Sequence, residues 1–325
     1  MVKIAVLDDW QHVARTSADW TTLTGRADVQ FFDVPFADED DAARQLAPFE
    51  ILLVTRERTP FPPSLVARLP RLKMFGLTGA RAGLIDTAGM IALGITVCYT
   101  SAGPSGSSTA ELALGLMLAA ARRIPAGDAA VRAGRFQLGV EAGPLLEGKT
   151  IGLIGLGRIG GRLAAYCRAL GMHVLAWSQN LTDEAARAAG AARVPKEQLL
   201  ATADVVSLHL VLSERTRGIL GTAELARMKQ GAILVNTARA QLVDEAALID
   251  AVGSRRIVAA LDVFYREPLP QSHPFTRAPN VVLTPHLGYG VIEVYREYYQ
   301  QCVENALAFL DGKPIRVLQS AGQGH

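Results

Sequence analysis

The feature of this chain that most constrains its fold is a glycine-rich turn near the middle. An apolar stretch, Lys149–Ile154, runs directly into Gly155-Leu-Gly157-Arg-Ile-Gly160, and a helical pattern follows over Gly161–Leu170. The turn alone is common, but a strand, a GxGxxG turn and a helix in direct succession are typical of dinucleotide-binding domains. Gly155 permits the tight turn, Gly157 lets the backbone approach a pyrophosphate, and Gly160 lets helix and strand pack closely. The phosphates would lie at the helix N-terminus, where N–H groups and the helix dipole favour negative charge.

Short apolar runs alternate with amphipathic stretches along the rest of the chain, a pattern typical of parallel sheets covered by helices. Strands are expected in two series, the first at 3–7, 51–55, 72–77 and 96–98, and the second at 151–154, 174–177, 205–208, 233–236, 257–261 and 281–284. Between the series, Thr100–Ser108 is a loop of small residues that indicates a crossing between domains. The spacing of Ser108 and Glu111 predicts a capping box at the start of the next helix. A helix over Ile292–Leu310 is expected to return the chain to the first domain.

The length and composition fit two ordered globular domains. The chain has 325 residues, of which 50% are hydrophobic and 20% are charged, so each domain can bury its own core. We therefore expect an α/β protein with two doubly wound parallel sheets. One domain is expected at 1–101 plus 291–325 and the other at 102–290.

Charge, hydropathy and cysteine content narrow the class of partners. A formal net charge of +2 gives no broad basic field, so neither nucleic acid nor an acidic membrane is expected as a partner. The longest apolar run, Leu112–Ala121, is too short to span a bilayer, and Asp8 and Asp9 stand where a secretory signal would carry its apolar core. The three cysteines lie far apart without a CxxC pair, which indicates reduced thiols and no zinc site. A cytoplasmic protein is expected.

The residue expected to hold the adenosine ribose follows the second strand of the dinucleotide-binding domain. Sites specific for NAD usually have Asp or Glu there, which accepts a hydrogen bond from the ribose 2′-OH. Here the stretch is Trp177-Ser178-Gln179-Asn180, which contains no acid. Repulsion against a 2′-phosphate is therefore absent, yet no arginine follows to bind one directly. NAD and NADP both stay open.

Three polar residues follow later strands, at the sheet edge where doubly wound folds bind their ligands. Arg239 can hold a carboxylate through two hydrogen bonds, and His286 can protonate an alkoxide near neutral pH. A carboxylate such as Glu267 on the far imidazole nitrogen would fix the tautomer and favour the charged form. Each has an ordinary alternative, as a surface ion pair, a structural histidine or a loop glutamate. Their recurrence at successive strand ends behind a dinucleotide loop predicts the reduction of a 2-keto acid.

These stretches, taken in order, resemble the D-isomer-specific 2-hydroxyacid dehydrogenase family. The resemblance is carried by Gly155–Gly160, Asn236–Arg239, Ala260–Phe264 with Glu267-Pro268, and Thr284–Gly288, with weaker similarity at Thr78–Arg81, Ile85-Asp86 and Thr109–Glu111. It implies a flavodoxin-like substrate-binding (catalytic) domain and a Rossmann domain that binds NAD or NADP, with an active-site cleft between them. Family members are usually dimers, so a homodimer is expected, and no metal is implied.

The resemblance also implies roles for single residues. Arg239 would bind the substrate carboxylate and carbonyl, His286 would be the general acid/base, and Glu267 would be its partner. The residues implied in substrate binding are Arg239 and the backbone of Gly79, Ala80 and Arg81. The residues implied in cofactor binding are Gly155, Gly157, Arg158, Ile159, Gly160, Ser178, Gln179, His209, Thr237, Ala238, Arg239, Asp262, His286 and Gly288. The expected substrates are small 2-keto acids, glyoxylate and hydroxypyruvate foremost, or the corresponding D-2-hydroxy acids.

Two departures and two alternatives accompany this hypothesis. Ser178 replaces the usual acid, which leaves the preference for NAD open. Tyr289 stands where many members have a small residue, so the pocket near the nicotinamide is expected to differ. A formate dehydrogenase is one alternative, but those enzymes pair the histidine with glutamine, whereas this chain has Glu267. The other is a non-enzymatic, dinucleotide-sensing protein like the C-terminal binding protein corepressors. It would require a peptide-docking groove on the N-terminal domain.

Overall fold

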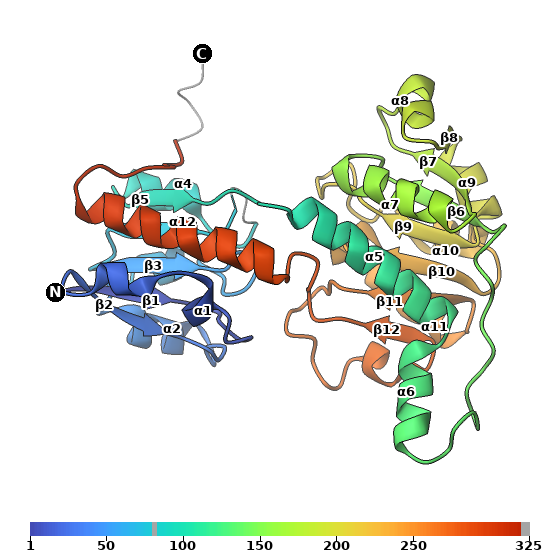
Figure 1. The fold of residues 1–325 in the computed structure, drawn as a ribbon, viewed down its shortest axis with the longest axis horizontal. Coiled ribbons are helices and arrows are strands. Elements are labelled where there is room, and N and C mark those ends of the chain that lie inside the picture. Colours follow the sequence, from blue (N-terminus) through green and yellow to red (C-terminus); the bar gives the residue numbers. More distant parts are fainter. Residues whose placement is uncertain (80–82, 320–325) are drawn as a thin grey trace. The chain divides into compact units, whose positions relative to one another are not determined.

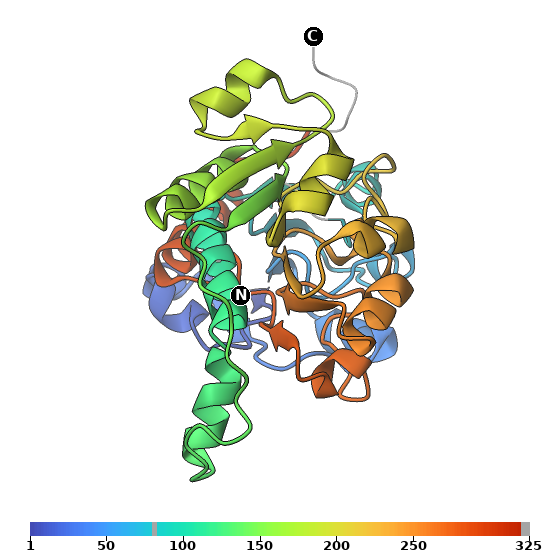
Figure 2. The same ribbon diagram turned by 90° about the vertical axis from the view of Figure 1, so that its right-hand side faces the viewer.

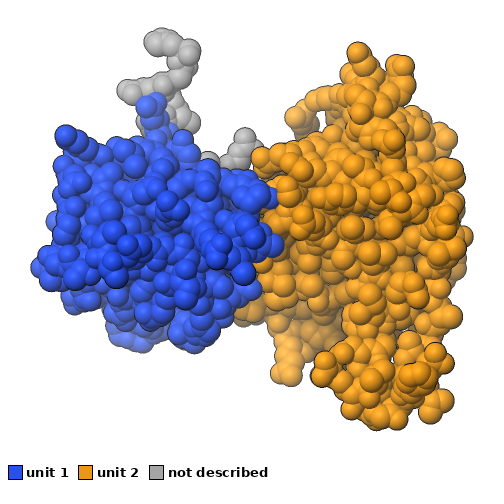
Figure 3. All heavy atoms as spheres, in the orientation of Figure 1, with its two compact units in different colours: residues 1–104, 291–325 blue, residues 105–290 orange. Residues whose placement is uncertain are grey.

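The computed structural model describes residues 1–79 and 83–319. The chain forms two compact units (Figure 3): unit 1 comprises Met1–Pro104 with Val291–His325, and unit 2 comprises Ser105–Gly290. Each unit has its own parallel sheet covered by helices (Figure 1). The predicted fold class, an α/β protein with two doubly wound sheets, is therefore confirmed.

Unit 1 is built on a five-stranded parallel sheet in the order β2-β1-β3-β4-β5, which is the order of flavodoxin-like folds. Its strands are β1 (Val2–Val6), β2 (Ala27–Phe31), β3 (Ile51–Val54), β4 (Met74–Leu77) and β5 (Thr96–Tyr99). Its helices are α1 (Ala14–Ser17), the 3₁₀ turn η1 (Trp20–Leu23), α2 (Glu39–Leu46), α3 (Pro63–Val66), α4 (Thr87–Ala92) and α12 (Ile292–Leu310). Strands β3 and β4 are buried along their whole length, as parallel strands are where helices cover both faces.

Unit 2 is built on a seven-stranded parallel sheet in the order β12-β11-β10-β9-β6-β7-β8. Its strands are β6 (Thr150–Ile154), β7 (His173–Trp177), β8 (Ala192–Arg193), β9 (Val205–Leu208), β10 (Ala232–Asn236), β11 (Ile257–Leu261) and β12 (Val281–Leu283). The chain runs from β6 to β8 in one direction and from β9 to β12 in the other, so the strand order reverses between the neighbours β6 and β9. Doubly wound sheets bind ligands at this switch point, outside the carboxyl ends of the strands.

Alternate residues of the buried strands face two separate cores in unit 2. On one face, α5 (Ser105–Ala121) and α7 (Arg158–Ala169) cover Ile233 and Val235 of β10. On the other face, α9 (Lys196–Thr202), α10 (Thr222–Arg227) and α11 (Glu245–Gly253) cover Leu234. The remaining elements are α6 (Ile124–Arg132), α8 (Asp183–Ala188) and the 3₁₀ turns η2 (Ala240–Leu242) and η3 (Pro274–Arg277). Helix α6 stands out from the rest of unit 2 (Figures 1 and 2).

Two strands were missed from the sequence, and both lie at the edges of their sheets. Strand β2 alternates buried or half-buried residues with exposed Asp28 and Gln30, so it lacks the continuous apolar run of a central strand. Strand β8 has only two residues. Helix α12, by contrast, has the predicted bounds and buries Tyr295, Tyr298 and Cys302 in unit 1.

The start of α5 corrects another prediction. The helix begins at Ser105, so Ser108 lies inside its first turn and is not the N-cap of a capping box. The Ser108 hydroxyl instead lies 3.0 Å from the carbonyl oxygen of Ser105 and 2.8 Å from that of Gly288, while Glu111 is exposed. A serine hydroxyl can bond back to a carbonyl of the preceding turn. The Ser-x-x-Glu spacing therefore did not fix where this helix starts.

No helix in residues 1–79 and 83–319 is long and apolar enough to cross a membrane. The three cysteines are buried free thiols. Burial raises the pKa of Cys98 to about 11 and the pKa of Cys167 and of Cys302 to about 12, so all three stay protonated at neutral pH. They are inert packing residues rather than nucleophiles.

Candidate active site

The glycine loop joins β6 to α7 at the switch point of the unit 2 sheet. Gly155 has φ +102°, and an added Cβ would lie 2.7 Å from the carbonyl oxygen of His209, so no other residue fits there. An added Cβ on Gly160 would lie 2.2 Å from the carbonyl oxygen of Gly155. Around Gly157, by contrast, a Cβ would meet nothing within 4 Å. The loop is thus closed toward the protein and open on its outer side.

The first turn of α7 faces this open side without a side-chain cap. Gly157 is the N-cap and has no side chain to accept from the N–H groups of Arg158, Ile159 and Gly160. Unsatisfied N–H groups at a helix N-terminus attract anions, and the helix dipole adds to the effect. The geometry therefore suits the pyrophosphate of a dinucleotide.

Two buried polar atoms at the same edge have no partner among the described residues: Nδ1 of His209, after β9, and Oγ1 of Thr237, after β10. Burial lowers the pKa of His209 to about 4, so its ring is neutral, and its Nε2 lies 2.9 Å from the hydroxyl of Ser207. A buried polar atom without a hydrogen bond costs free energy, so such atoms usually mark a place for a further group. Strands β9 and β10 are neighbours, and both residues were predicted to contact the cofactor.

His286 and Glu267 are brought together by the strand order. The Nδ1 of His286 lies 2.7 Å from Oε2 of Glu267, and the other carboxylate oxygen accepts from the N–H of Phe264 at 2.9 Å. His286 has φ +53°, a left-handed conformation that is strained for a residue with a side chain. The Tyr289 ring packs edge-on against the imidazole, with ring centroids 5.8 Å apart. Because Nδ1 is engaged, Nε2 is the nitrogen that can exchange a proton.

Asp262 holds the loop that carries His286. It is completely buried, and its carboxylate accepts from the Thr284 hydroxyl at 2.6 Å, the Leu287 N–H at 2.7 Å and the Gly288 N–H at 2.9 Å. Burial raises the pKa of Asp262, and these hydrogen bonds oppose the rise. Asp262, which was predicted as a cofactor contact, thus lies beneath the 284–288 loop.

Arg239 lies in a turn that Asn236 closes. The Asn236 side-chain amide donates to the carbonyl of Arg239 at 2.9 Å, and its oxygen accepts from the N–H of Ala238 at 3.0 Å. Asn236 is fully buried at the end of β10, and Arg239 is half-buried. Neither Asn236 nor Thr284 was assigned a role from the sequence. The sequence feature that could have indicated their roles is an amide or hydroxyl side chain placed directly between a buried strand and a functional loop.

The stretch that was predicted to contact the adenosine ribose follows β7. The N–H of Gly155 donates to the carbonyl of Trp177 at 2.8 Å, which places the end of β7 beside the glycine loop. Ser178 is half-buried, and Gln179 and Asn180 are exposed. The stretch that was predicted to contact the adenosine ribose is thus accessible and carries no acid.

In unit 1, the predicted substrate contact Gly79 follows β4. It has φ +82°, its N–H donates to the Thr100 hydroxyl at 2.9 Å, and an added Cβ would lie 2.8 Å from Nη1 of Arg56. The other two predicted contacts, Ala80 and Arg81, lie outside the described residues.

The carboxyl end of β1 carries a second polar group that sequence analysis did not single out. The carboxylate of buried Asp8 accepts from the hydroxyl of Thr59 at 2.7 Å, and the guanidinium of Arg58 lies 4.5 Å from the centre of the Trp10 ring. Burial raises the pKa of Asp8 to about 6, against the opposing effect of Thr59 and Arg58. In the part of the chain that the structure describes, no cluster of three or more His, Cys, Asp or Glu side chains could hold a metal ion.

The sheet order, the glycine loop and the polar residues at the switch point define a dinucleotide-binding domain in unit 2. Residues 114–288 match the family described as "D-isomer specific 2-hydroxyacid dehydrogenase, NAD binding domain". The chain belongs to the D-isomer specific 2-hydroxyacid dehydrogenase family, as the sequence motifs predicted, and unit 2 contains its NAD-binding domain.

Named relatives are similar over most of this chain. It is 36% identical to the D-3-phosphoglycerate dehydrogenase of Archaeoglobus fulgidus over 85% of this chain and 52% of that protein. It is 39% identical to the glyoxylate reductase of Aeropyrum pernix over 77% of this chain and 76% of that protein. The crystal structure of phosphoglycerate oxidoreductase from Vibrio cholerae o395 has a TM-score of 0.91 and 38% identity, covering 96% of this chain and 100% of that one. The chain thus spans about half the length of the Archaeoglobus relative.

Proposed function

We propose that this protein is an NAD(P)-dependent D-2-hydroxyacid dehydrogenase, which interconverts a small 2-keto acid and a D-2-hydroxy acid. The observation that carries the proposal is the His286–Glu267 pair, 2.7 Å apart, at the same sheet edge as the glycine loop. A histidine backed by a carboxylate is suited to general acid/base catalysis. A formate dehydrogenase releases CO₂ without general acid catalysis, so the pair argues against that alternative. The corepressor-type sensing proteins keep the same motifs, so turnover of a 2-keto acid is what separates them from the enzyme.

Each polar side chain has a task in this reaction. A nicotinamide cofactor, when bound, would supply the hydride for reduction of the substrate carbonyl carbon and would accept it in the reverse direction. Nε2 of His286 donates a proton to the carbonyl oxygen in reduction and takes it back from the hydroxyl in oxidation. Glu267 stabilises the imidazolium charge, and the Arg239 guanidinium holds the substrate carboxylate and polarises the carbonyl.

We propose that unit 2 holds the cofactor through its glycine loop and through two side chains that each have a buried polar atom without a hydrogen-bond partner among the described residues. The N–H groups of Arg158 and Ile159 at the start of α7 would receive the pyrophosphate. His209 and Thr237 would find partners for their buried polar atoms. Further predicted contacts are Gly155, Gly157, Gly160, Ser178, Gln179, Ala238, Arg239, Asp262, His286 and Gly288. In unit 1, the backbone of Gly79, and of Ala80 and Arg81 outside the described residues, would meet the substrate carboxylate.

NADPH is proposed as a cofactor used at least as well as NADH. Ser178 is half-buried and no acid stands between Trp177 and Leu181, so nothing in this stretch repels a 2′-phosphate. Ser178→Asp introduces a carboxylate that accepts from a ribose 2′-OH and repels a phosphate, so it should shift kcat/KM toward NADH. Strong NADH selectivity of the wild type would contradict the proposal.

A homodimer is proposed, with α6 and the segment after it as the contact surface. Ile124, Val131, Phe136, Leu138 and Leu145 each expose more than half of their surface. Exposed apolar side chains grouped on one projecting element are typical of a protein–protein interface. Analytical ultracentrifugation should therefore show a dimer at micromolar concentration, and the double change Phe136→Asp/Leu138→Asp should yield monomers. A monomeric wild type would contradict this proposal.

The activity is tested with a panel of 2-keto acids. Glyoxylate, hydroxypyruvate, pyruvate and bulkier 2-keto acids are each offered with NADH and with NADPH, and D-3-phosphoglycerate is offered with the oxidised cofactors. We expect cofactor oxidation with the small 2-keto acids and a D product wherever a stereocentre forms. An L product, or cofactor binding without turnover of any of these acids, would refute the proposal, and the second outcome would favour the sensing protein.

A further inference from the structure

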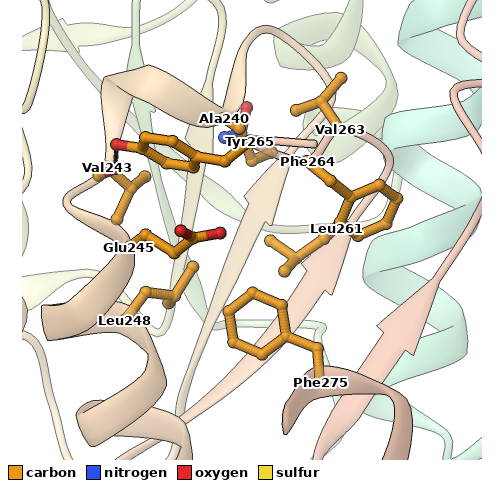
Figure 4. A pocket seen from close by; sticks show the side chains of 10 residues that line it. Ala240, Val243, Glu245, Leu248, Leu261, Val263, Phe264, Tyr265 and Phe275 are labelled. Atoms are coloured by element: carbon orange, nitrogen blue, oxygen red, sulfur yellow. Dashed lines mark hydrogen bonds between the residues drawn. The ribbon is translucent and has the colours of Figure 1, made fainter. Parts of the chain in front are cut away.

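The loops that carry Arg239 and Glu267 follow the neighbouring strands β10 and β11. Side chains from both loops line a small pocket (Figure 4). The last backbone bond between them at the sheet runs from the N–H of Asp262 to the carbonyl of Asn236, at 3.0 Å. Beyond it, Val243 lines one side of the pocket and Phe264 the other, so much of the lining is apolar. Apolar contacts are non-directional and do not fix the spacing of two loops as a hydrogen bond does.

Tyr265 bridges the two loops. Its hydroxyl donates to the carbonyl oxygen of Val243 at 2.7 Å, the bond drawn in Figure 4. Val243 lies four residues after Arg239, and Tyr265 lies two residues before Glu267. Burial raises the pKa of Tyr265, and the nearby carboxylates of Asp244 and Glu245 raise it further. The phenol therefore stays protonated and remains a donor across the neutral range.

The effect of this bond reaches the acid/base pair through the backbone. Glu267 is held at one oxygen by the N–H of Phe264, the residue next to Tyr265, and at the other by His286. A shift of the 264–265 backbone would move the first of these partners and change the geometry of the second. The Nδ1 of His286 faces Glu267, and Asp262 is a further titratable group close to this histidine.

We propose that Tyr265 is a positioning residue, whose hydrogen bond to Val243 fixes the Glu267 loop relative to the Arg239 loop. The inference rests on the proposed function, because it gives Arg239 and the His286–Glu267 pair one common substrate. Tyr265 itself touches neither substrate nor cofactor in this proposal. It acts through Glu267.

The test removes the hydroxyl and keeps the ring. In Tyr265→Phe, kcat/KM for 2-keto acid reduction should fall about three- to tenfold, the worth of one hydrogen bond. The pH at which reduction loses its rate should also move lower, since a loosened Glu267 favours the charged imidazole less. Tyr265 is 42% exposed. Tyr166→Phe, at a half-buried tyrosine on α7, is the control for loss of a phenol hydroxyl and should leave kcat/KM and its pH dependence unchanged.

A double-mutant cycle separates positioning from general damage. In the Glu267→Gln background, Tyr265→Phe should change kcat/KM by less than about twofold, because the group it acts through is already altered. An equal loss in both backgrounds, or an equal loss in Tyr166→Phe, would overturn the proposal.

An NMR titration of the His286 ring without substrate adds a readout that needs no turnover. Its midpoint should move to lower pH in Tyr265→Phe, and an unmoved midpoint would also overturn the proposal. If the wild type reduced no 2-keto acid, the proposed function would fail while this titration still decided the role of Tyr265.

Discussion

The carboxyl ends of the two sheets carry similar polar residues but hold them in different ways. In unit 2, the Asp262 carboxylate accepts hydrogen bonds from two backbone N–H groups and a hydroxyl. One oxygen of the Glu267 carboxylate accepts from a backbone N–H, and the other is hydrogen-bonded to His286. In unit 1, the closest contact of Asp8 is with the rotatable hydroxyl of Thr59, and the Arg58 guanidinium rests on an aromatic ring. The two backbone donors to the Asp262 carboxylate lie 2.7 and 2.9 Å away, whereas the backbone N–H of Thr59 lies 3.5 Å from the carboxylate of Asp8.

This difference in how the polar groups are held indicates which unit carries out the chemical step. Groups fixed before the reaction stabilise developing charge without reorganising, which is how electrostatic catalysis works. Unit 2 meets that condition, so we assign proton transfer to it. Asp8 in unit 1 is held by longer backbone contacts and has a raised pKa, so we expect it to affect stability more than the chemical step.

The largest test of this comparison is His286→Ala in unit 2. The change removes the proton donor, so turnover of 2-keto acids should fall by roughly two to four orders of magnitude, the usual worth of a positioned acid. Cofactor binding, followed by nucleotide fluorescence, should weaken far less than turnover, because His286 is one of many predicted contacts to the cofactor. A loss of less than tenfold in kcat would mean that another group donates the proton.

Asp8→Asn in unit 1 should act on stability instead. Because burial raises the pKa of Asp8 from 3.8 to about 6, the folded state binds this proton more tightly than the unfolded chain does. The stabilisation is complete below pH 3.8 and is lost as the pH rises through 6. Ionised Asp8 then costs at most about 3 kcal/mol, and the asparagine avoids this cost.

The free energy of unfolding of the Asp8→Asn variant, measured between pH 4 and 8, should therefore increase relative to that of the wild type as the pH rises. Asp28→Asn, at an exposed position on β2 of the same unit, is the control and should show no such trend. The kcat of Asp8→Asn should stay within about twofold of the wild type. A parallel pH dependence of the two proteins would show that Asp8 is not the titrating group.

Glu267→Gln tests the His286–Glu267 pair in unit 2 and should have a smaller effect on turnover than His286→Ala. The amide keeps the shape and removes the charge, so the charged imidazole of His286 loses its counter-ion and becomes less stable. Reduction at neutral pH should slow by about tenfold, the difference between a charge-assisted and a neutral hydrogen bond. The informative measurement is the pH profile of kcat/KM, whose fall should begin at a lower pH. An unchanged profile would remove Glu267 from the dyad.

Features of the fold and site that depend on neighbouring residues could be predicted from the sequence better than features that depend on residues far apart in the chain. The strand–turn–helix at Gly155 was predictable because its glycines act within six residues. The approach of His286 and Glu267 was also predictable, since parallel strands end at the same edge of a sheet. The burial of Asp262 beneath the 284–288 loop was not, because it depends on backbone donors from another strand. The edge strand β2 was missed because exposed polar residues alternate along it.

The smallest expected effect concerns the anchor between α5 and the loop of His286. The hydroxyls of Ser108 and Thr109 each lie 2.8 Å from the carbonyl oxygen of Gly288, and both also reach the carbonyl of Ser105. Each hydroxyl has one proton, so each can donate to only one of the two carbonyl oxygens at a time. Thr109→Val removes one donor from a buried site while Ser108 still serves Gly288, so the cost should be about 1 kcal/mol in unfolding free energy.

A comparison with two further variants decides whether this anchor matters for the site. Thr202→Val on α9 removes a hydroxyl that bonds only within its own helix at an exposed position, and it should cost less than Thr109→Val. Ser108→Ala/Thr109→Val leaves the Gly288 carbonyl without either donor, and its cost should exceed the sum of the single changes. Its kcat should also fall, since Gly288 lies two residues after His286. If the double change were additive and left kcat unaltered, the acid/base loop would be held from the Asp262 side alone.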